Sequence, residues 1–202
     1  MGGTVAALYS LESGIEVRPT DDVDCIVSIA TLGEYYAFVD RLLAHGFEPC
    51  TDEGAPICRR KCAGILVDIV PTVDTPIGPT NRWYVDGMRD AREYETEGVT
   101  VRAITPVYFI ATKLEAFSSR GDGDFLESHD LEDMLTVLGG LKQLRDLIEA
   151  ASSGVAAEVR SELVFLADND DFRAALPGHF PGHPVGQEQA RRVRAWLRAL
   201  KT

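Results

Sequence analysis

Two stretches of the sequence determine the expected fold. The first predicts a buried strand over residues 23–30; it is Asp22 followed by Val23-Asp24-Cys25-Ile26-Val27-Ser28-Ile29-Ala30. The second predicts another strand and reads GILVDIVP at residues 64–71. Residues two apart in a strand point to the same face, so Asp22 and Asp24 share one face. The second strand carries a single carboxylate, Asp68, in its apolar middle. These stretches predict a sheet that accommodates three acidic groups.

The rest of the chain surrounds these strands with further predicted elements. Further strands are predicted at 56–61 and 99–105, with a turn at Ala63-Gly64. Helices are predicted at 4–11, 32–46, 106–118, 130–138, 141–151, 154–167 and 187–200. Residues 72–98 are expected to be loop with a short helix near 85–93, 119–129 a loop, and 176–186 a linker. Strands early and helices late predict an α+β chain, with a sheet domain at 1–105 and a helical region at 106–202.

Composition and charge narrow the possible functions. The chain has 202 residues, of which 45% are hydrophobic, and a net charge of -12. Such a chain can bury a core, but its charge repels nucleic acid unless a basic patch exists locally. The last predicted helix offers such a patch, although its arginines are equally consistent with a solvated face. No signal peptide, membrane-length apolar run or paired cysteine motif is recognisable, so a reduced, cytoplasmic protein with no membrane contact is expected.

The acidic residues raise a chemical question. Two carboxylates on one strand face repel each other strongly unless a cation lies between them, and a third on a neighbouring strand completes a magnesium-type oxygen site. The alternatives are a solvated strand end for Asp22 and Asp24, and a salt bridge to Arg or Lys for Asp68. Gly2-Gly3-Thr4 precedes a predicted helix. The free N–H groups at a helix start and the unhindered glycine backbone suit a phosphate, but glycines before a helix can also form only a turn.

Taken together, these motifs resemble the DNA polymerase β-like nucleotidyltransferase superfamily. The resemblance rests on Gly2-Gly3-Thr4, Arg18-Pro19-Thr20-Asp21-Asp22-Val23-Asp24 and Asp68, and it covers roughly residues 1–135. Within that superfamily the chain is most similar to the AbiEii/AbiGii-type nucleotidyltransferases, which are often toxins of toxin–antitoxin pairs. This second likeness rests on three segments: Tyr108 to Phe117 with Lys113, then Ser119-Arg120, and then His129-Asp130-Leu131-Glu132-Asp133. It implies a mixed sheet flanked by helices.

The resemblance also implies residue roles. Asp22 and Asp24 would bind the magnesium ion that holds the triphosphate, and Asp24 and Asp68 would share a second ion, with manganese as a substitute. Nucleotide contacts would come from Gly2, Gly3, Thr4, Arg18, Thr20, Lys113 and Arg120. The alternatives are salt bridges for Arg18 and Arg120, and a surface lysine for Lys113. Asp130 would orient Lys113 or act near the acceptor, or it simply caps its helix. His129 is expected to be a loop histidine, and His179 and His183 structural or solvated.

The implied activity is transfer of a nucleoside monophosphate from an NTP to a hydroxyl, with release of pyrophosphate. The acceptor would be a tRNA end or other RNA, a protein, or a small molecule. Two alternatives stay open at this point: a non-catalytic nucleotide- or RNA-binding module on the same fold, and the toxin half of a complex with an antitoxin protein. The long stretch between Thr4 and Asp22, compared with the family pattern, motivates the non-catalytic alternative.

Overall fold

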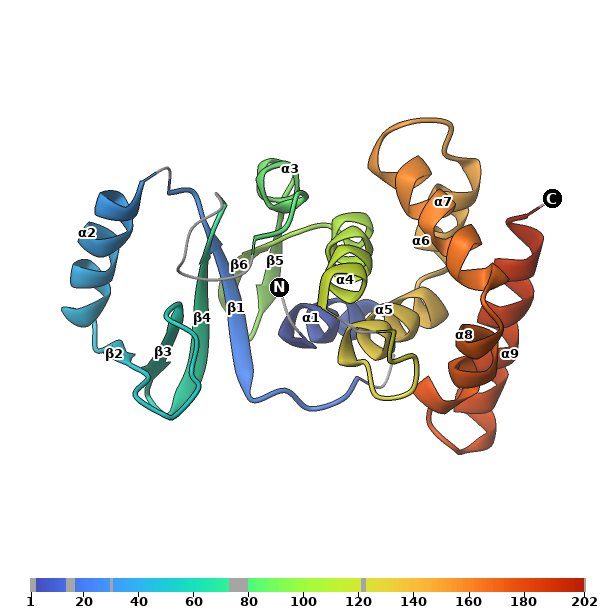
Figure 1. Cartoon of the computed structure of the whole chain (residues 1–202), viewed down its shortest axis with the longest axis horizontal. Coiled ribbons are helices and arrows are strands. Elements are labelled where there is room, and N and C mark those ends of the chain that lie inside the picture. The colour runs from blue at the N-terminus through green and yellow to red at the C-terminus, as the bar shows by residue number, and fades with distance from the viewer. Residues whose placement is uncertain (1–2, 14–16, 30, 73–79, 121–122, 202) are drawn as a thin grey trace. The chain divides into compact units, whose positions relative to one another are not determined.

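The structure is a computed structural model that describes residues 3–13, 17–29, 31–72, 80–120 and 123–201 (Figure 1). The chain divides into two compact units, one of Met1–Val5 with Pro19–Ile104 and the other of Ala6–Arg18 with Thr105–Thr202. It is an α+β protein, with a mixed sheet and flanking helices, as the sequence predicted. The helical unit therefore includes residues 6–18 as well as the C-terminal half.

The first unit is built on a four-stranded mixed sheet. Its strands lie in the order β1 (Asp22–Val27), β4 (Ile65–Pro71), β3 (Arg59–Cys62) and β2 (Glu48–Pro49). Strand β1 is parallel to β4, whereas β3 is antiparallel to both β4 and β2. β1 ends at Val27, which lies opposite Pro71, whereas the apolar run predicted a strand to residue 30. Beyond this pair, Thr72 N–H still donates to the carbonyl oxygen of Val27 at 3.1 Å.

The turn predicted between β3 and β4 is confirmed. Ala63 and Gly64 both adopt positive φ, 49° and 84° respectively. Two consecutive residues with positive φ are what a two-residue hairpin of the favoured twist requires. The strand before this turn begins at Arg59 rather than at the predicted residue 56.

One face of this sheet is covered by helix α2 (Leu32–Leu43). Thr31 and Glu34 form a reciprocal capping box that begins the helix. Tyr35 and Val39 of α2 are buried together with Val67 and Ile69 of β4 in a single apolar cluster, which Cys25 and Val27 of β1 join. Since side chains alternate along a strand, Asp22, Asp24 and Asp68 lie on the opposite face.

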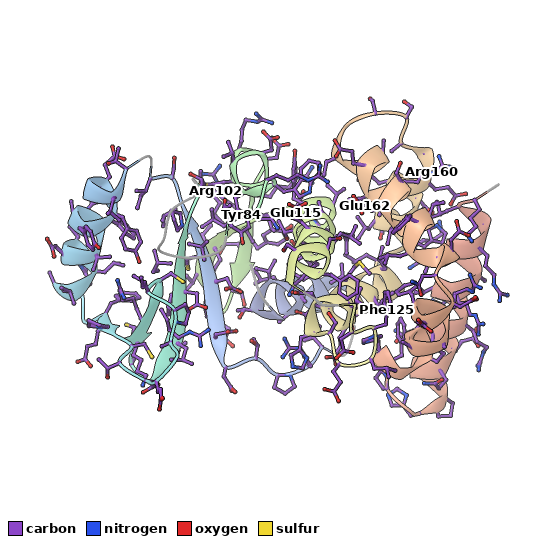
Figure 2. The ribbon with its side chains drawn as sticks, viewed as in Figure 1. Tyr84, Arg102, Glu115, Phe125, Arg160 and Glu162 are labelled. Atoms are coloured by element: carbon purple, nitrogen blue, oxygen red, sulfur yellow. The ribbon has the colours of Figure 1, made fainter. Side chains whose placement is uncertain are left out.

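A second, two-stranded sheet completes the first unit and corrects the prediction for residues 72–98. Helix α3 (Tyr84–Arg89) is followed by β5 (Arg92–Thr96), which pairs antiparallel with β6 (Val99–Ala103). The loop prediction was wrong for β5 because none of its side chains is buried, so it shows no apolar alternation. Glu97 and Gly98, with φ of 50° and 77°, form the turn and were its only local signal. Arg102 Nη2 donates to the carbonyl oxygen of Met88 at 3.1 Å and ties β6 to α3 (Figure 2).

The second unit consists of helices. It contains most of α1 (Gly3–Ser13), then α4 (Pro106–Arg120), α5 (His129–Gly140), α6 (Lys142–Ala150), α7 (Gly154–Asp168), α8 (Asp170–Ala175), the 3-10 helix η1 (Leu176–His179) and α9 (Pro184–Ala199). The buried face of α5 is nearly continuous. No helix within the described ranges has the length and apolarity needed to cross a membrane.

The linker predicted at residues 176–186 is wrong. Its first part forms η1, and both His179 and Phe180 are buried. His179 Nε2 lies 2.7 Å from the carbonyl oxygen of Phe125, and His183 Nδ1 accepts from Gly186 N–H at the start of α9. Glycine and proline signalled a flexible connection, but the apolar residues among them pack into the core. The structural interpretation of His179 and His183 agrees with these contacts.

Side chains from several helices hold the second unit together. The Phe125 ring lies 5.3 Å from that of Phe117 and 6.1 Å from that of Phe172, measured between centroids (Figure 2). Arg160 of α7 donates from Nη1 to the carbonyl oxygen of Glu149 at 3.1 Å and from Nη2 to that of Leu200 at 3.5 Å. These contacts join side chains and backbone from different helices, so they fix the helices of this unit against one another.

Candidate functional site

The three predicted acids converge on one face of the sheet. Asp24 of β1 lies directly opposite Asp68 of β4 in the parallel register, and Asp22 lies two residues before Asp24. Side chains of paired residues in neighbouring strands point the same way, so all three carboxylates belong to the face that α2 does not cover. Asp68 is buried, with 8% of its surface exposed, whereas Asp22 and Asp24 are half-buried. A buried carboxylate requires a compensating charge or donor.

Arg59 supplies that compensation. Its Nε donates to Asp68 Oδ1 at 2.8 Å and its Nη2 to Asp68 Oδ2 at 2.7 Å, a two-point contact between a guanidinium and a carboxylate. The same Nη2 lies 3.6 Å from Asp22 Oδ2. The hydrogen bonds to Asp68 raise the pKa of the Arg59 guanidinium, so this cation keeps its charge at any physiological pH. Of the two readings that the sequence left open for Asp68, the structure displays the salt bridge.

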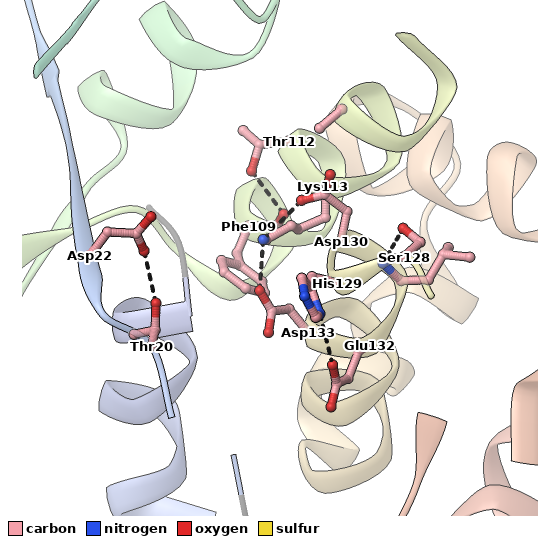
Figure 3. Close-up of polar contacts among 12 residues, drawn as sticks. Thr20, Asp22, Phe109, Thr112, Lys113, Ser128, His129, Asp130, Glu132 and Asp133 are labelled. Carbon is pink, nitrogen blue, oxygen red and sulfur yellow. Dashed lines mark hydrogen bonds and ion pairs between the residues drawn. The ribbon is translucent and has the colours of Figure 1, made fainter. Parts of the chain in front are cut away.

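Two threonines fix Asp22. Thr20 Oγ1 donates to Asp22 Oδ1 at 2.8 Å (Figure 3). Thr4 Oγ1 donates to the backbone oxygen of Asp22 at 2.8 Å. Gly3 is packed closely here, since a Cβ atom on it would lie 3.2 Å from the Cβ of Thr20. The structure thus brings Gly3, Thr4, Thr20 and Asp22 together at the start of β1. Gly2 falls outside the described residues.

The donor chemistry of this face fits a hard divalent cation. Magnesium prefers carboxylate oxygens combined with water and substrate phosphates, and three carboxylates meet that preference. Among the residues that the structure describes, however, no three His, Cys, Asp or Glu side chains are grouped closely enough to hold a metal as they stand. Arg59 engages both oxygens of Asp68, and Thr20 engages one oxygen of Asp22. The residue types therefore suit a metal ion, whereas the side chains as they stand are engaged with Arg59 and Thr20.

A second charged cluster lies in the helical unit. Lys113 of α4 donates from Nζ to Asp130 Oδ1 at 3.0 Å and to Asp133 Oδ2 at 2.7 Å (Figure 3). Burial lowers the pKa of the Lys113 ammonium, but the charges of Asp133 and Asp130 outweigh burial and leave that pKa raised. Lys113 is therefore a permanent cation that is shared between two carboxylates of α5. The predicted link between Lys113 and Asp130 exists, and Asp133, three residues on, faces the same way.

Arg18 belongs to this helical cluster. Its Nε lies 3.3 Å from Asp133 Oδ1 and 3.6 Å from Glu132 Oε2. Asp133 thus lies between two cations, Lys113 and Arg18. The predicted nucleotide contact for Arg18 stays a prediction, and the side chain of Arg120 lies outside the described residues.

Capping at the start of α5 differs from one of the sequence alternatives. Ser128, rather than Asp130, is the N-cap, because its side chain accepts from Leu131 N–H at 3.3 Å. Asp130 lies inside the first turn, where its side chain is directed to Lys113. His129 was expected in a loop, but it is the first residue of the helix and its Nδ1 lies 3.3 Å from Glu132 Oε2. The cap interpretation of Asp130 is therefore wrong.

No protein-family model, curated protein or solved structure matches this chain. A functional proposal therefore rests on the geometry of the two clusters and on the motifs of the sequence.

Sequence reasoning missed Arg59, although the signal was available. A two-residue turn at Ala63-Gly64 makes residues pair symmetrically about it, and Cys62 lies opposite Ile65. Three further steps along each strand place Arg59 opposite Asp68. The predicted turn therefore contained the partner of Asp68, but the strand was assigned to residues 56–61 without working out its register.

Proposed function

We propose that this protein is a metal-dependent nucleotidyltransferase that transfers a nucleoside monophosphate from an NTP to a hydroxyl acceptor. The observation that supports the proposal best is the register of β1 and β4, which places Asp24 directly opposite Asp68 on the face that also carries Asp22. Three carboxylates on one sheet face are costly to fold and are the donor set that magnesium prefers. The resemblance of the motifs to the polymerase β-like superfamily supports the same activity and the same fold.

The acids would hold the metal ions in this proposal. Asp22 and Asp24 would bind the ion that carries the triphosphate, and Asp24 and Asp68 the ion that faces the acceptor hydroxyl. When bound, the ions would neutralise charge on the attacking and leaving oxygens of an in-line displacement. Thr20 would act as a positioning residue, because its hydroxyl holds one oxygen of Asp22 and so orients the other.

Transfer assays test the proposal directly. Each labelled NTP is incubated with the protein, Mg²⁺ and, in separate reactions, total RNA, tRNA and the protein itself as acceptor. Label is expected in one acceptor with wild type and is expected to be lost with Asp24→Asn. Asp21→Asn is the matched control. Asp21 is an exposed aspartate that precedes the strand, and its substitution removes the same charge. Failure of wild type to label any acceptor, or equal labelling by wild type and Asp24→Asn, would contradict the proposal.

The ion pair between Arg59 and Asp68 favours a second candidate, a non-catalytic nucleotide-binding module. A carboxylate that is neutralised permanently by arginine needs no metal. Such a module would bind an NTP with the same affinity in the presence of EDTA and of Mg²⁺, whereas the enzyme would require the metal. Calorimetric titration of ATP and GTP under both conditions separates the two candidates.

A further inference from the structure

Arg59 bridges two of the three acids that the proposed function assigns to metal binding. It contacts both oxygens of Asp68 and approaches Asp22 Oδ2 at 3.6 Å, so one guanidinium spans the two strands that supply the predicted metal ligands. Arg59 does not belong to the motifs that suggested nucleotidyl transfer. Its position on β3, opposite Asp68 of β4, is a property of the hairpin register in this chain.

A guanidinium and a divalent cation cannot share this place. Magnesium binds carboxylate oxygen at about 2.0–2.1 Å and requires near-octahedral space around it. The forked contact of Arg59 uses one acceptor site on each oxygen of Asp68, and its Nη2 also lies 3.6 Å from Asp22 Oδ2. Coulomb repulsion between the fixed charge of the guanidinium and the double charge of the ion also opposes joint binding, because both would lie within a few ångströms of one carboxylate.

The surroundings allow Arg59 to leave. Its side chain is 26% exposed and that of Asp22 is 36% exposed, so the outer edge of the ion pair reaches solvent. Asp68 has no such freedom, since its side chain is only 12% exposed and lies within β4. Release of Arg59 would leave a buried carboxylate uncompensated unless another cation replaced it. The exchange of one cation for another avoids that penalty.

We propose that Arg59 is a built-in substitute for the metal, which holds Asp68 and Asp22 in the metal-free protein and is displaced when the divalent ion binds. This inference rests on the proposed function, because it assumes that Asp22, Asp24 and Asp68 bind a metal. It makes Arg59 a positioning residue that lowers the apparent affinity for the metal and frees a cationic group when the metal arrives.

Metal binding by an Arg59 variant tests this proposal without any measurement of activity. Mn²⁺ is titrated into wild type and into Arg59→Met, and the free ion is measured by electron paramagnetic resonance. Arg59→Met keeps much of the length and apolar packing of the side chain and removes its charge. We expect it to bind Mn²⁺ at least about tenfold more tightly than wild type, since the competing cation is gone.

Lys61→Met is the matched control. Lys61 is a cation on the same strand, but its Nζ pairs with exposed Asp52 at 2.8 Å rather than with the three acids. Its removal changes the net charge equally, so it should alter the affinity for Mn²⁺ by less than about twofold if screening by salt is kept constant. An equal gain in affinity for both variants would show a general charge effect and overturn the proposal.

The fate of Arg59 in the unmodified protein provides a second readout. The Arg59 Nε–H donates to Asp68. In ¹⁵N nuclear magnetic resonance, the exchange of this hydrogen with solvent should therefore be slow in the metal-free protein. Saturating Mg²⁺, which is diamagnetic, should shift this resonance and accelerate its exchange. A resonance that keeps its position and protection after Mg²⁺ has bound would contradict displacement. This experiment remains decisive even if Arg59→Met is unstable, since it uses wild type alone.

The outcomes separate this inference from the proposed function. If wild type transfers nucleotide while both it and Arg59→Met bind Mn²⁺ equally, the function stands and the role of Arg59 is wrong. If neither protein binds Mn²⁺ and wild type transfers nothing, both fail. Tighter binding by Arg59→Met that disappears on adding Asp24→Asn would assign the effect to this acidic face.

Discussion

Asp24 and Asp68 lie directly opposite each other in two parallel strands. Neighbouring strands are about 4.8 Å apart, so the folded chain holds two carboxylates close together on one face. Like charges at this separation oppose folding unless a cation is present. In this structure that cation is Arg59, which the hairpin between β3 and β4 places beside Asp68. The hairpin therefore supports the acidic face electrostatically.

Asp68→Asn should lower the free energy of unfolding by about 2–3 kcal/mol. The substitution leaves Arg59 facing a neutral amide that can accept through only one atom, so one of two charge-assisted hydrogen bonds is lost. Urea denaturation at pH 7 measures the change. Asp52→Asn is the control, because Asp52 pairs with Lys61 on the same hairpin but is exposed, and its loss should be much smaller. Equal losses would show that the buried pair stabilises the fold no more than the exposed pair does.

The thiol of Cys58 should resist alkylation in the folded protein. Burial raises the pKa of this thiol, and the negative charge of Asp68 raises the pKa further. The thiolate is the nucleophile, so iodoacetamide at pH 8.5 should modify Cys58 only after urea unfolds the chain. Because the folded protein holds this proton where the unfolded chain releases it, stability should fall as pH rises above the ordinary thiol range. Mass spectrometry of native samples that shows rapid modification at Cys58 would contradict the prediction.

Gly186→Ala should destabilise the start of α9 severely. A Cβ atom on Gly186 would lie 2.3 Å from the backbone oxygen of Pro181, a distance that forces the backbone to move. We expect a loss of about 2–4 kcal/mol, in the upper range for overpacking. Gly178→Ala is the matched control, since nothing lies within 4 Å of its Cβ position and its φ is not positive. Thermal melts of the two variants should differ clearly, and similar melts would rule out this close approach.

The sequence predicted the elements whose side chains are buried on one side. β4 and α2 were recognisable because their apolar residues follow the strand and helix periods. β5 was missed because its residues are polar or half-buried, so tertiary pairing with β6 rather than periodicity determines its structure. The segment around His179 was missed for the opposite reason, since glycine and proline concealed residues that pack into the core.

In the candidate site too, some residues were recognisable from the sequence and others were not. Asp22, Asp24 and Asp68 were recognisable because carboxylates within apolar strands are rare and costly. Arg59 was missed because its pairing with Asp68 depends on the register of the hairpin. The three residues between Arg59 and the turn do not by themselves indicate that pairing. The pairing of Lys113 with Asp133 likewise depends on how two helices pack, which spacing along the chain does not determine.

Lys113→Met should lower the free energy of unfolding by about 2–4 kcal/mol. The side chain of Asp133 is only 3% exposed, and the substitution removes one of its two cationic partners together with the partner of Asp130. The raised pKa of Lys113 means that its stabilising charge is present at neutral pH and is lost only as pH rises above the ordinary lysine range. The loss should therefore be complete in urea melts at pH 7.

A surface pair provides the control for Lys113. Lys142 and Asp146 form an ion pair at 2.6 Å with side chains that are 75% and 57% exposed, so Lys142→Met should unfold almost like wild type. Lys113→Arg should restore part of the stability, because it keeps the charge but fits a different geometry. If Lys113→Met and Lys142→Met unfold at the same urea concentration, the buried network contributes nothing to stability. A role of Lys113 in phosphate binding would then be the better explanation for its position, and the Michaelis constant for NTP of Lys113→Arg would test it.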